Sequence, residues 1–398
     1  MRRRWTMTPS HCSRCSVPSR ALPATSASDQ QRPRRVLVVD DSAFMRRLIS
    51  DVVGADPTFE VVGTARDGED ALRKVRALDP DIVTLDVVMP GMDGLEALRV
   101  IMNEYPRPVV MLSAGGPDGA AATLRALELG AVDFVRKPSG PISLDLGRVR
   151  EHLFDALHAA SSAQSSSSVA SRVAAAPQPI VEPRASSTTR KRSVARDVAS
   201  TVPPRWVVCI ASSTGGPAAL TRIVPALQMH EDVAYIVVQH LPETFTRSLA
   251  HRLDQLSRIP VFEVQDTMAL SGGHIYIAQG GRHVKVADKP RLRFVLDDGA
   301  PIWGVRPAAD PLFESVARLF GASVMGVVLT GMGRDGAEGL KVIRDHGGIG
   351  IVQDRESSVV PGMPVAAREH AGCEHVVSLD LVAATVEHAL EQLKGEVQ

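Results

Sequence analysis

Two separate regions of this chain alternate short apolar runs with stretches of helical periodicity, which restricts the folds that the chain can adopt. In the first region the strand-like runs lie at 36–39, 59–63, 82–85, 109–112 and 133–135, and helical patterns at 43–53, 69–78, 94–105 and 119–129 separate them. Strands that alternate with helices in this way form parallel sheets covered by helices on both faces. The pattern therefore predicts an α/β domain with a doubly wound parallel sheet.

The same alternation returns in the second half of the chain. Strand-like runs lie at 206–210, 234–238, 261–264, 275–278, 284–286, 323–329 and 348–353, and a helical pattern over 381–394 closes the region. Some of the strands around 275–296 have the spacing of hairpins. We therefore expect a second parallel-sheet α/β domain that also contains some antiparallel strands.

The segment between the two regions has a different composition. Residues 154–203 are rich in Ser, Ala, Pro and Arg and contain the run Ser-Ser-Ser-Ser. A segment of this composition cannot bury a core and is typical of a flexible linker. The expected organisation is a disordered extension over 1–34, a first domain over 35–153, a linker over 154–203 and a second domain over 204–395.

Composition excludes some classes of function. Lys+Arg and Asp+Glu are both 45, so the formal net charge is zero and provides no electrostatic basis for nucleic-acid binding. No apolar run reaches the roughly 18–20 residues of a membrane helix. The basic N-terminal segment lacks the apolar centre of a secretory signal. We expect a monomeric cytoplasmic protein without membrane insertion, in which the Cys12-x-x-Cys15 pair is incidental.

Polar residues follow the predicted strands of the first region. Asp40 and Asp41 come directly after the first strand, Asp86 ends the third, Ser113 ends the fourth and Lys137 follows the fifth. The carboxyl ends of parallel strands meet at one edge of a sheet, where ligands bind. Clustered carboxylates favour Mg²⁺, and a carboxylate beside Mg²⁺ and a lysine can accept a phosphoryl group. We therefore predict a phosphoryl-transfer site here.

Residues 36–138 resemble a response-regulator receiver domain, a flavodoxin-like fold. The resemblance lies in the motifs VLVVDDSAFMRR, LDVVMPGMDGLEAL, MLSA and DFVRKP. It implies that Asp86 is the phospho-acceptor and that Ser113 and Lys137 contact the phosphoryl group. Phe134 occupies the position of the family's aromatic switch, although a core aromatic residue there has the same appearance in sequence.

The same resemblance implies a magnesium cofactor for phosphorylation. Its expected ligands are Asp41, Asp86 and the backbone carbonyl of Val88, with assistance from Asp40.

A second set of reactive residues lies in the second region. Ser213 follows a strand, and the turn Gly215-Gly216 leads into a helix whose N-terminus offers free N–H groups to an anion. His240 follows an apolar strand, and Asp335 follows another. A serine becomes nucleophilic when a base removes its proton and donors stabilise the oxyanion. The order Ser, His, Asp does not exclude a triad, because the same geometry occurs with different orders.

The residues alone leave other interpretations open. The STGG turn is compatible with simple anion binding, and TGMGRDG is compatible with a phosphate- or nucleotide-binding turn. A single histidine at a strand end is more often structural than catalytic.

Residues 206–392 resemble the catalytic domain of the chemotaxis protein-glutamate methylesterases, with a Rossmann-like α/β fold. The matching stretches are SSTGGPAAL, VVQHLPETFTRSLAHRL, IYIAQGGRH, TGMGRDGAEGL and QDRESSVVPGMPVAA. The resemblance implies that Ser213 is the nucleophile, His240 the base and Asp335 its orienting carboxylate. Thr214 and the backbone N–H of Met332 are then candidates to support the hydroxyl and the oxyanion, and no cofactor is expected for hydrolysis.

Some positions depart from the family pattern. Ala211-Ser212 replaces the usual Gly-Ala before the nucleophile, so Ser212 is an alternative nucleophile. Pro361 replaces an aromatic residue, and Ala308 replaces a serine. These changes affect the expected shape of the substrate groove and leave the proposed chemistry in place.

The two resemblances together imply a phosphorylation-regulated enzyme of chemotaxis-type signalling. Its substrates would be methyl-accepting chemoreceptors, from which it would remove glutamate methyl esters and whose glutamines it would deamidate. Its phosphodonor would be a chemotaxis-type histidine kinase. The alternative is a phosphorylation-dependent adaptor that binds receptors without hydrolysis. A DNA-binding regulator is not supported, because no basic helix-turn-helix follows the linker.

Overall fold

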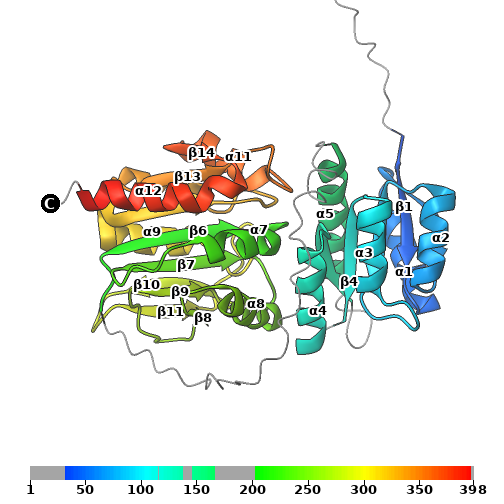
Figure 1. The fold of residues 1–398 in the computed structure, drawn as a ribbon, viewed down its shortest axis with the longest axis horizontal. Coiled ribbons are helices and arrows are strands. Elements are labelled where there is room, and N and C mark those ends of the chain that lie inside the picture. Colours follow the sequence, from blue (N-terminus) through cyan, green and yellow to red (C-terminus); the bar gives the residue numbers. More distant parts are fainter. Residues whose placement is uncertain (1–31, 115, 138–145, 166–201, 396–398) are drawn as a thin grey trace, which may run out of the picture. The chain divides into compact units, whose positions relative to one another are not determined.

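Five parallel strands form the sheet of the N-terminal domain, in the order β2-β1-β3-β4-β5. The structure is a computed structural model that describes residues 32–114, 116–137, 146–165 and 202–395 (Figure 1). The elements of this domain are β1 (Arg34–Val39), α1 (Ala43–Val53), β2 (Phe59–Ala65), α2 (Gly68–Leu78), β3 (Ile82–Asp86), α3 (Gly94–Glu104), β4 (Val109–Ser113), α4 (Pro117–Glu128), β5 (Asp133–Arg136) and α5 (Leu146–Ser165).

Helices cover both faces of this sheet, as the alternating sequence predicts. Buried side chains of α1 and α5 pack with Val36 and Val38 of β1, whereas those of α2, α3 and α4 pack with Leu37 and Val39. Successive strand residues point to opposite faces, so a fully apolar strand buries both. The predicted doubly wound, flavodoxin-like sheet is confirmed.

Helix α5 extends further than the sequence pattern indicated. It runs to Ser165, whereas the first domain was expected to end at residue 153. Leu157, Ala160 and Ala163 are buried in the same core cluster as β1, so this part of the expected linker belongs to the domain. The sequence pattern of this segment indicated burial only weakly, because each alanine side chain contributes little apolar area.

Seven parallel strands form the main sheet of the C-terminal domain, in the order β14-β13-β12-β6-β7-β9-β8. Its strands are β6 (Trp206–Ser212), β7 (Val233–Gln239), β8 (Val261–Glu263), β9 (His274–Ile277), β12 (Val324–Val328), β13 (Ile349–Gln353) and β14 (His375–Val377). Strands β10 (His283–Ala287) and β11 (Arg293–Asp297) form a separate antiparallel pair. The expected antiparallel addition is therefore this pair, whereas β9 belongs to the parallel sheet.

Helices of the C-terminal domain also lie on both faces of its sheet. They are α7 (Gly216–Ile223), α8 (Glu243–Leu256), α9 (Ala309–Phe320), α10 (Ala337–Asp345), α11 (Gly362–Ala371) and α12 (Val382–Gly395), with 3₁₀ turns at Val224–Ala226, Gly321–Ser323 and Leu379–Leu381. Helices α7, α8 and α12 pack on the face that carries Val208 and Ile210. Helices α9, α10 and α11, with β10 and β11, pack on the face that carries Val207 and Cys209.

The predicted reactive residues lie where the strand order changes direction. Strand β6 lies between β7 and β12, and β1 lies between β2 and β3. Loops that leave neighbouring strands in opposite directions open a crevice at such a point. Each sheet therefore places its set of predicted residues at the position where α/β proteins bind ligands.

Several predictions fall on residues outside the described ranges. They concern the Cys12–Cys15 pair, most of the N-terminal extension and the linker from 166 to 201. Among the described residues, none of the helices combines the length and the hydropathy needed to cross a bilayer.

Candidate active site and phosphorylation site

The structure gathers the predicted phosphorylation residues at the carboxyl edge of the N-terminal sheet. Lys137 Nζ lies 2.7 Å from Asp40 Oδ2 and 2.6 Å from Asp86 Oδ2, and both carboxyl groups are buried. Burial is the largest influence on Asp86 and raises its pKa, although the Lys137 ammonium acts in the opposite direction. Lys137 therefore compensates part of a strongly negative site.

The carboxylates of this edge fit a divalent cation. One oxygen from each of Asp40, Asp41 and Asp86 lies within 4.8 Å of the others, and Asp41 is exposed to solvent. The backbone N–H of Val88 is 3.4 Å from Asp86 Oδ1, so its peptide lies beside the cluster. Hard oxygen donors of this kind suit Mg²⁺. The donor set therefore agrees with the magnesium site that the sequence predicted.

Ser113 completes this edge from the end of β4. Its side chain is buried, and Ser113 Oγ lies 2.7 Å from Thr123 Oγ1 of α4. The hydroxyl thus connects the site to α4. Thr123 was not identified from the sequence.

Ser213 directly follows β6 and precedes the N-terminus of α7. Gly215 is the N-cap residue of this helix and has φ = 77°, a backbone conformation that residues with a Cβ atom rarely adopt. A Cβ atom on Gly216 would lie 2.0 Å from Gln239 Oε1, so glycine allows the close approach of the two strand ends. The turn therefore holds the serine at the positive end of the helix dipole.

The structure distinguishes between the two adjacent serines. Ser212 is fully buried, and its hydroxyl donates a hydrogen bond to Gln239 Oε1 at 2.7 Å. Gln239 Nε2 in turn donates to the backbone oxygen of Ser213 at 2.9 Å. Ser213 is half-buried and lines a cavity with His240, and its Oγ has no hydrogen-bond partner among the described residues. Ser212 therefore has a structural partner, whereas Ser213 faces the cavity.

His240 and Asp335 form a close pair at the same edge. His240 Nε2 lies 2.7 Å from Asp335 Oδ2, and the two side chains are 8% and 2% exposed. His240 Nδ1 is buried and has no hydrogen-bond partner within the described part of the chain. With Nε2–H directed at the carboxylate, Nδ1 is the nitrogen that remains to accept a proton.

Asp335 is held by more than the histidine. Its Oδ2 also accepts a hydrogen bond from the backbone N–H of Ala309 at 2.6 Å. Its Oδ1 accepts one from the backbone N–H of Asp310 at 3.2 Å. Burial alone would raise the pKa of Asp335, but His240 and the two N–H groups outweigh it and lower the pKa below its usual value. Asp335 is therefore ionised at neutral pH and suited to stabilise a protonated imidazole.

The two other predicted members of this site differ in their surroundings. Thr214 is buried, and its hydroxyl donates a hydrogen bond to Asp133 Oδ2 of the N-terminal domain at 2.5 Å. Burial raises the pKa of Asp133, while the Thr214 bond acts to lower it. Met332 is 42% exposed in the loop after β12. In this arrangement the Thr214 hydroxyl is not directed to Ser213.

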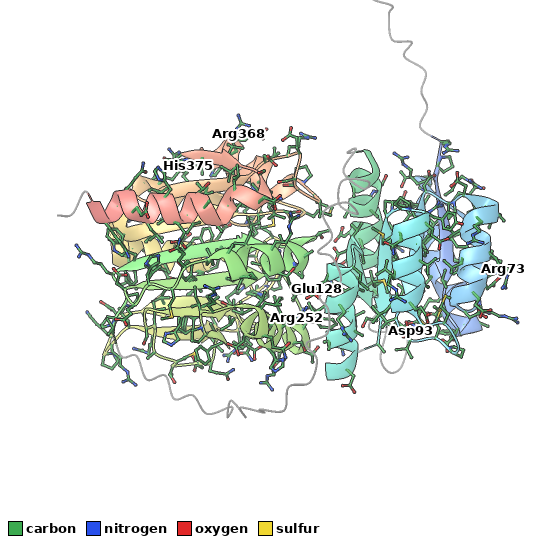
Figure 2. All side chains as sticks on the ribbon, viewed as in Figure 1. Arg73, Asp93, Glu128, Arg252, Arg368 and His375 are labelled. Atoms are coloured by element: carbon green, nitrogen blue, oxygen red, sulfur yellow. The ribbon has the colours of Figure 1, made fainter. Side chains whose placement is uncertain are left out.

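Further contacts join the two domains around this point, and the described residues from Pro33 onward form one compact unit. The rings of Phe134 and Phe245 stack with centroids 4.5 Å apart. Arg252 of α8 makes a bidentate ion pair with Glu128 of α4, in which Nε lies 2.8 Å from Oε1 and Nη2 lies 3.0 Å from Oε2. Both residues are labelled in Figure 2.

These contacts leave little free space next to Ser213. The cavity that it lines with His240 has a volume of about 40 Å³, and Leu127, Asp133 and Phe134 form part of its wall. Ligand pockets usually measure about 300–1,000 Å³, so this space is too small for a glutamyl ester. The arrangement described here is therefore closed to a macromolecular substrate.

Three residues that the sequence did not identify are part of this site. The Gln239 amide donates to the backbone oxygen of Ser213, and the Asp133 carboxylate accepts from the Thr214 hydroxyl. The backbone N–H of Asp310 donates to the Asp335 carboxylate. Gln239 is adjacent to His240, and Asp310 lies two residues after Ala308, so their positions gave a signal. Nothing in the sequence around Asp133 indicated a contact with the second domain.

The residues at the carboxyl edges of the two sheets together define a class of protein. A receiver-type carboxylate and lysine site precedes an α/β domain that brings a serine, a histidine and a carboxylate to the switch point of its sheet. Residues 36–146 match the family described as response regulator receiver domain, and residues 208–386 match the family described as CheB methylesterase.

Similar proteins extend the match to almost the whole chain. A protein-glutamate methylesterase/protein-glutamine glutaminase of Pyrococcus abyssi is 43% identical over 367 residues, which cover 92% of this chain and 95% of that protein. The protein of the same name from Symbiobacterium thermophilum is 45% identical over 360 residues, 90% of this chain and 98% of its own length. The CheB methylesterase catalytic domain of Thermotoga maritima is 37% identical, with a TM-score of 0.45, over 47% of this chain and 98% of that one.

This chain belongs to the protein-glutamate methylesterase/protein-glutamine glutaminase family, in which a receiver domain precedes a CheB-type methylesterase domain.

Proposed function

We propose that this chain hydrolyses glutamate γ-methyl esters on methyl-accepting chemoreceptors, under the control of phosphorylation at Asp86. The observation that carries the hydrolase assignment is the His240–Asp335 pair at 2.7 Å, next to Ser213 at the N-terminus of α7. A buried carboxylate, an imidazole with one free nitrogen and a serine at a helix N-terminus are the parts that acyl transfer requires. Family membership supports the choice of substrate.

The residues divide the reaction into two steps. Ser213 Oγ attacks the ester carbonyl carbon while His240 Nδ1 takes the hydroxyl proton, and Asp335 stabilises the imidazolium through Nε2–H. His240 then gives the proton to the leaving methoxide, which departs as methanol. Water attacks the acyl-serine, passes its proton through Nδ1 to Ser213 and releases the glutamate carboxylate.

Backbone donors would stabilise the tetrahedral intermediates. The candidates are the N–H of Met332 and the backbone N–H groups at the turn into α7, since both follow strand ends at the carboxyl edge of the sheet. Gly216 is not among them, because its N–H donates to the backbone oxygen of Ser213 at 2.7 Å, and Pro217 has no N–H. A preorganised donor of this kind contributes about 10²–10³ in rate. Deamidation of a receptor glutamine would use the same acyl-enzyme, with ammonia as the leaving group.

Phosphorylation would act through the contacts between the domains. Phe134 stacks on Phe245, Asp133 binds Thr214, and Glu128 pairs with Arg252 in the closed arrangement. A phosphoryl group on Asp86 would be contacted by Ser113 and Lys137, at the ends of β4 and β5. Because Asp133 and Phe134 lie on β5, a shift of this strand would weaken the closed state and expose Ser213.

Asp41, Asp86 and the carbonyl of Val88 would hold Mg²⁺, with Asp40 assisting. The ion would neutralise phosphoryl oxygens while the Asp86 carboxylate is phosphorylated. The proposed phosphodonor is a chemotaxis-type histidine kinase.

Methanol release from methylated receptor membranes tests the proposal. Purified full-length protein is assayed with and without a small phosphodonor, and Ser213→Ala and Ser212→Ala serve as a matched pair. We expect release by the wild type and by Ser212→Ala, no release by Ser213→Ala, and stimulation by the phosphodonor. Folded wild-type protein that binds receptors but releases no methanol under either condition would contradict the hydrolase and favour the adaptor.

A further inference from the structure

Asp310 is a buried carboxylate that the reaction described above does not use. It lies in the first turn of α9 and is 5% exposed. Its Oδ1 accepts hydrogen bonds from the backbone N–H groups of Gly336 and Gly339, at 3.0 and 2.8 Å. These groups begin α10, so Asp310 caps a helix other than its own.

Asp335 caps the N-terminus of α9 in the same way. It accepts hydrogen bonds from the N–H groups of Ala309 and Asp310, which begin α9, while it lies just before α10. The N-cap residues of the two helices, Ala308 and Gly336, make no side-chain cap of their own. The first N–H groups of a helix have no partner within it, so each helix depends on the aspartate associated with the other.

This reciprocal capping restricts the direction of Asp335. If its carboxylate rotated away from His240, the N–H groups of Ala309 and Asp310 would be left buried and unpaired, which is unfavourable. If Asp310 lost its carboxylate, the start of α10 would lose its partners, and this segment is continuous with Asp335.

The arrangement also places two carboxylates close together. Burial and, next, the charge of Asp335 raise the pKa of Asp310 to about 6. A buried like-charge neighbour is unfavourable, so the stabilising contribution of this pair comes from the N–H groups that it satisfies.

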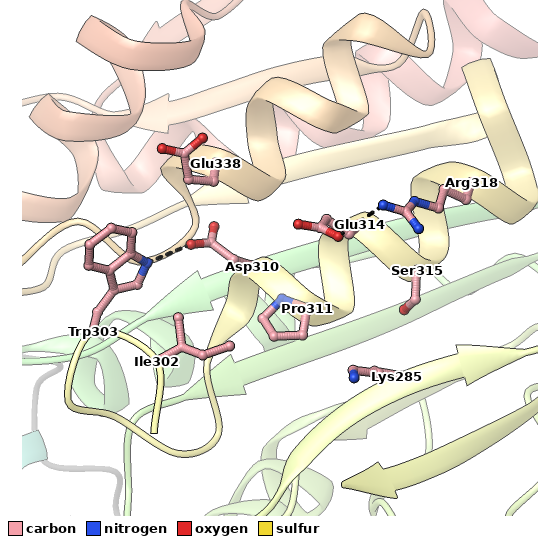
Figure 3. A pocket seen from close by; sticks show the side chains of 9 residues that line it. All are labelled: Lys285, Ile302, Trp303, Asp310, Pro311, Glu314, Ser315, Arg318 and Glu338. Carbon is pink, nitrogen blue, oxygen red and sulfur yellow. Dashed lines mark hydrogen bonds and ion pairs between the residues drawn. The ribbon is translucent and has the colours of Figure 1, made fainter. Parts of the chain in front are cut away.

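Trp303 holds the second oxygen of Asp310. Its indole Nε1–H donates a hydrogen bond to Asp310 Oδ2 at 2.8 Å, as Figure 3 shows, and its ring is 49% exposed. The guanidinium carbon of Arg334, which directly precedes Asp335, lies 4.6 Å from the ring centroid. Trp303 and Asp310 both line a surface cavity of about 460 Å³.

We propose that Asp310 is a positioning residue for the hydrolase reaction, which holds Asp335 toward His240 through the reciprocal capping of α9 and α10, and that Trp303 fixes Asp310 in turn. This inference rests on the proposed hydrolase function. Asp310 contacts neither the serine nor the substrate space next to it, so it acts through Asp335 alone. Loss of the interaction should therefore lower kcat and leave KM unchanged.

Asp310→Asn, Trp303→Phe and their combination test the proposal, with Glu314→Gln as the control. Glu314 lines the same cavity, and its one ion pair with a described residue is with Arg318 on the surface. Asparagine can still accept hydrogen bonds from the α10 N–H groups, but its amide N–H groups then face the indole N–H. Phenylalanine removes that donor, so the double variant should recover part of the activity that Asp310→Asn loses.

Two measurements are made on the full-length protein. One is kcat and KM for methanol release. The other is the downfield ¹H NMR signal of the His240 Nε2 proton, assigned by its loss in His240→Gln, which reports the bond to Asp335 without any substrate. We expect about a 10²-fold lower kcat in Asp310→Asn, as for a misplacement of about 1 Å, with a shifted signal. Trp303→Phe should show a smaller change in the same direction.

The outcomes separate this proposal from the proposed function. An unchanged kcat together with an unchanged His240 Nε2 proton signal in Asp310→Asn overturns the positioning role. A lower kcat with an unshifted signal, and no recovery of activity in the double variant, overturns it as well. If the wild type releases no methanol, the proposed function fails while the His240 signal still decides the role of Asp310. If Asp310→Asn does not fold, Trp303→Phe decides it, since the exposed indole can be replaced without creating a cavity.

Discussion

The hydroxyl of Thr214 donates a 2.5 Å hydrogen bond to Asp133, so the residue after the candidate nucleophile is bound to the edge strand of the other domain. The same strand carries Phe134, which stacks on Phe245. A change in β5 that accompanies phosphorylation would therefore act on the candidate active site without an intermediate element.

The ion pair between Arg252 and Glu128 should favour the closed state. Arg252→Ala removes both of its hydrogen bonds to Glu128, and we expect a few-fold higher methanol release without phosphodonor, as a partly buried pair contributes on the order of 1 kcal/mol. Arg247→Ala is the control, because Arg247 lies on the same helix and pairs with Glu263. Equal basal rates in the two variants would argue against the closure.

Stimulation by a phosphodonor should require both Asp86 and a divalent cation. Asp86→Asn cannot form the acyl phosphate, and chelation of Mg²⁺ removes the charge that neutralises phosphoryl oxygens. We expect both treatments to abolish stimulation and to leave basal methanol release intact. Loss of basal release on chelation, restored by Mg²⁺, would show that hydrolysis itself depends on the ion.

Asp335→Asn should reduce kcat by about 10³–10⁴-fold, because the amide cannot stabilise the imidazolium and favours the wrong tautomer of His240. Steady-state methanol release measures the loss. Asp345→Asn is a control, since Asp345 lies at the exposed end of α10 and, of the side chains that the structure describes, pairs only with Lys341. A loss of tenfold or less in Asp335→Asn would remove Asp335 from the triad.

Gly331→Ala should disturb the nucleophile directly. An added Cβ would lie 2.2 Å from Met363 Sδ and 2.8 Å from Ser213 Cβ, so one of these neighbours must move. We expect a lower kcat and a loss of about 1–3 kcal/mol in the free energy of unfolding, as for an overpacked core. Chemical denaturation and methanol release report the two effects. Gly147→Ala in α5 is the control, because no described atom beyond its chain neighbours and its own helix backbone lies within 4 Å of the new Cβ. It should lower neither kcat nor the free energy of unfolding.

The pKa of Asp310 predicts a pH dependence of stability. Its value of about 6 in the folded protein exceeds the usual 3.8, so the folded state binds this proton more tightly than the unfolded state. The contribution is complete below about pH 4 and is lost as the pH rises through about 6, by about 2–3 kcal/mol. The lowered pKa of Asp335 acts in the opposite direction, because its contribution is lost as the pH falls below its usual value.

Urea unfolding at pH 4 and pH 7 measures this dependence. The free energy of unfolding of the wild type should decrease between these values relative to Asp310→Asn, which has no carboxyl group to titrate there. Glu314→Gln should keep the wild-type difference. Parallel pH profiles of the wild type and Asp310→Asn would show that the carboxyl group does not titrate in this range.

Local sequence was sufficient to predict the strands and the residues at their ends. Fully apolar runs such as Val36–Val39 and Trp206–Ile210 can only be buried on both faces, and parallel strands bring their carboxyl ends to one edge. Asp40, Asp86 and Lys137, and also His240 and Asp335, were therefore expected to meet, and the distances in the structure agree. Their chemical roles remain predictions.

Only the tertiary structure decided what surrounds these residues. Burial and hydrogen bonding separate Ser212 from Ser213, although the two are neighbours in the sequence. The contacts of Asp133 with Thr214 and of Asp310 with the start of α10 join residues far apart in the chain. Such contacts depend on how helices and domains pack, which periodicity does not encode, whereas the strand ends follow from local pattern and the geometry of a parallel sheet.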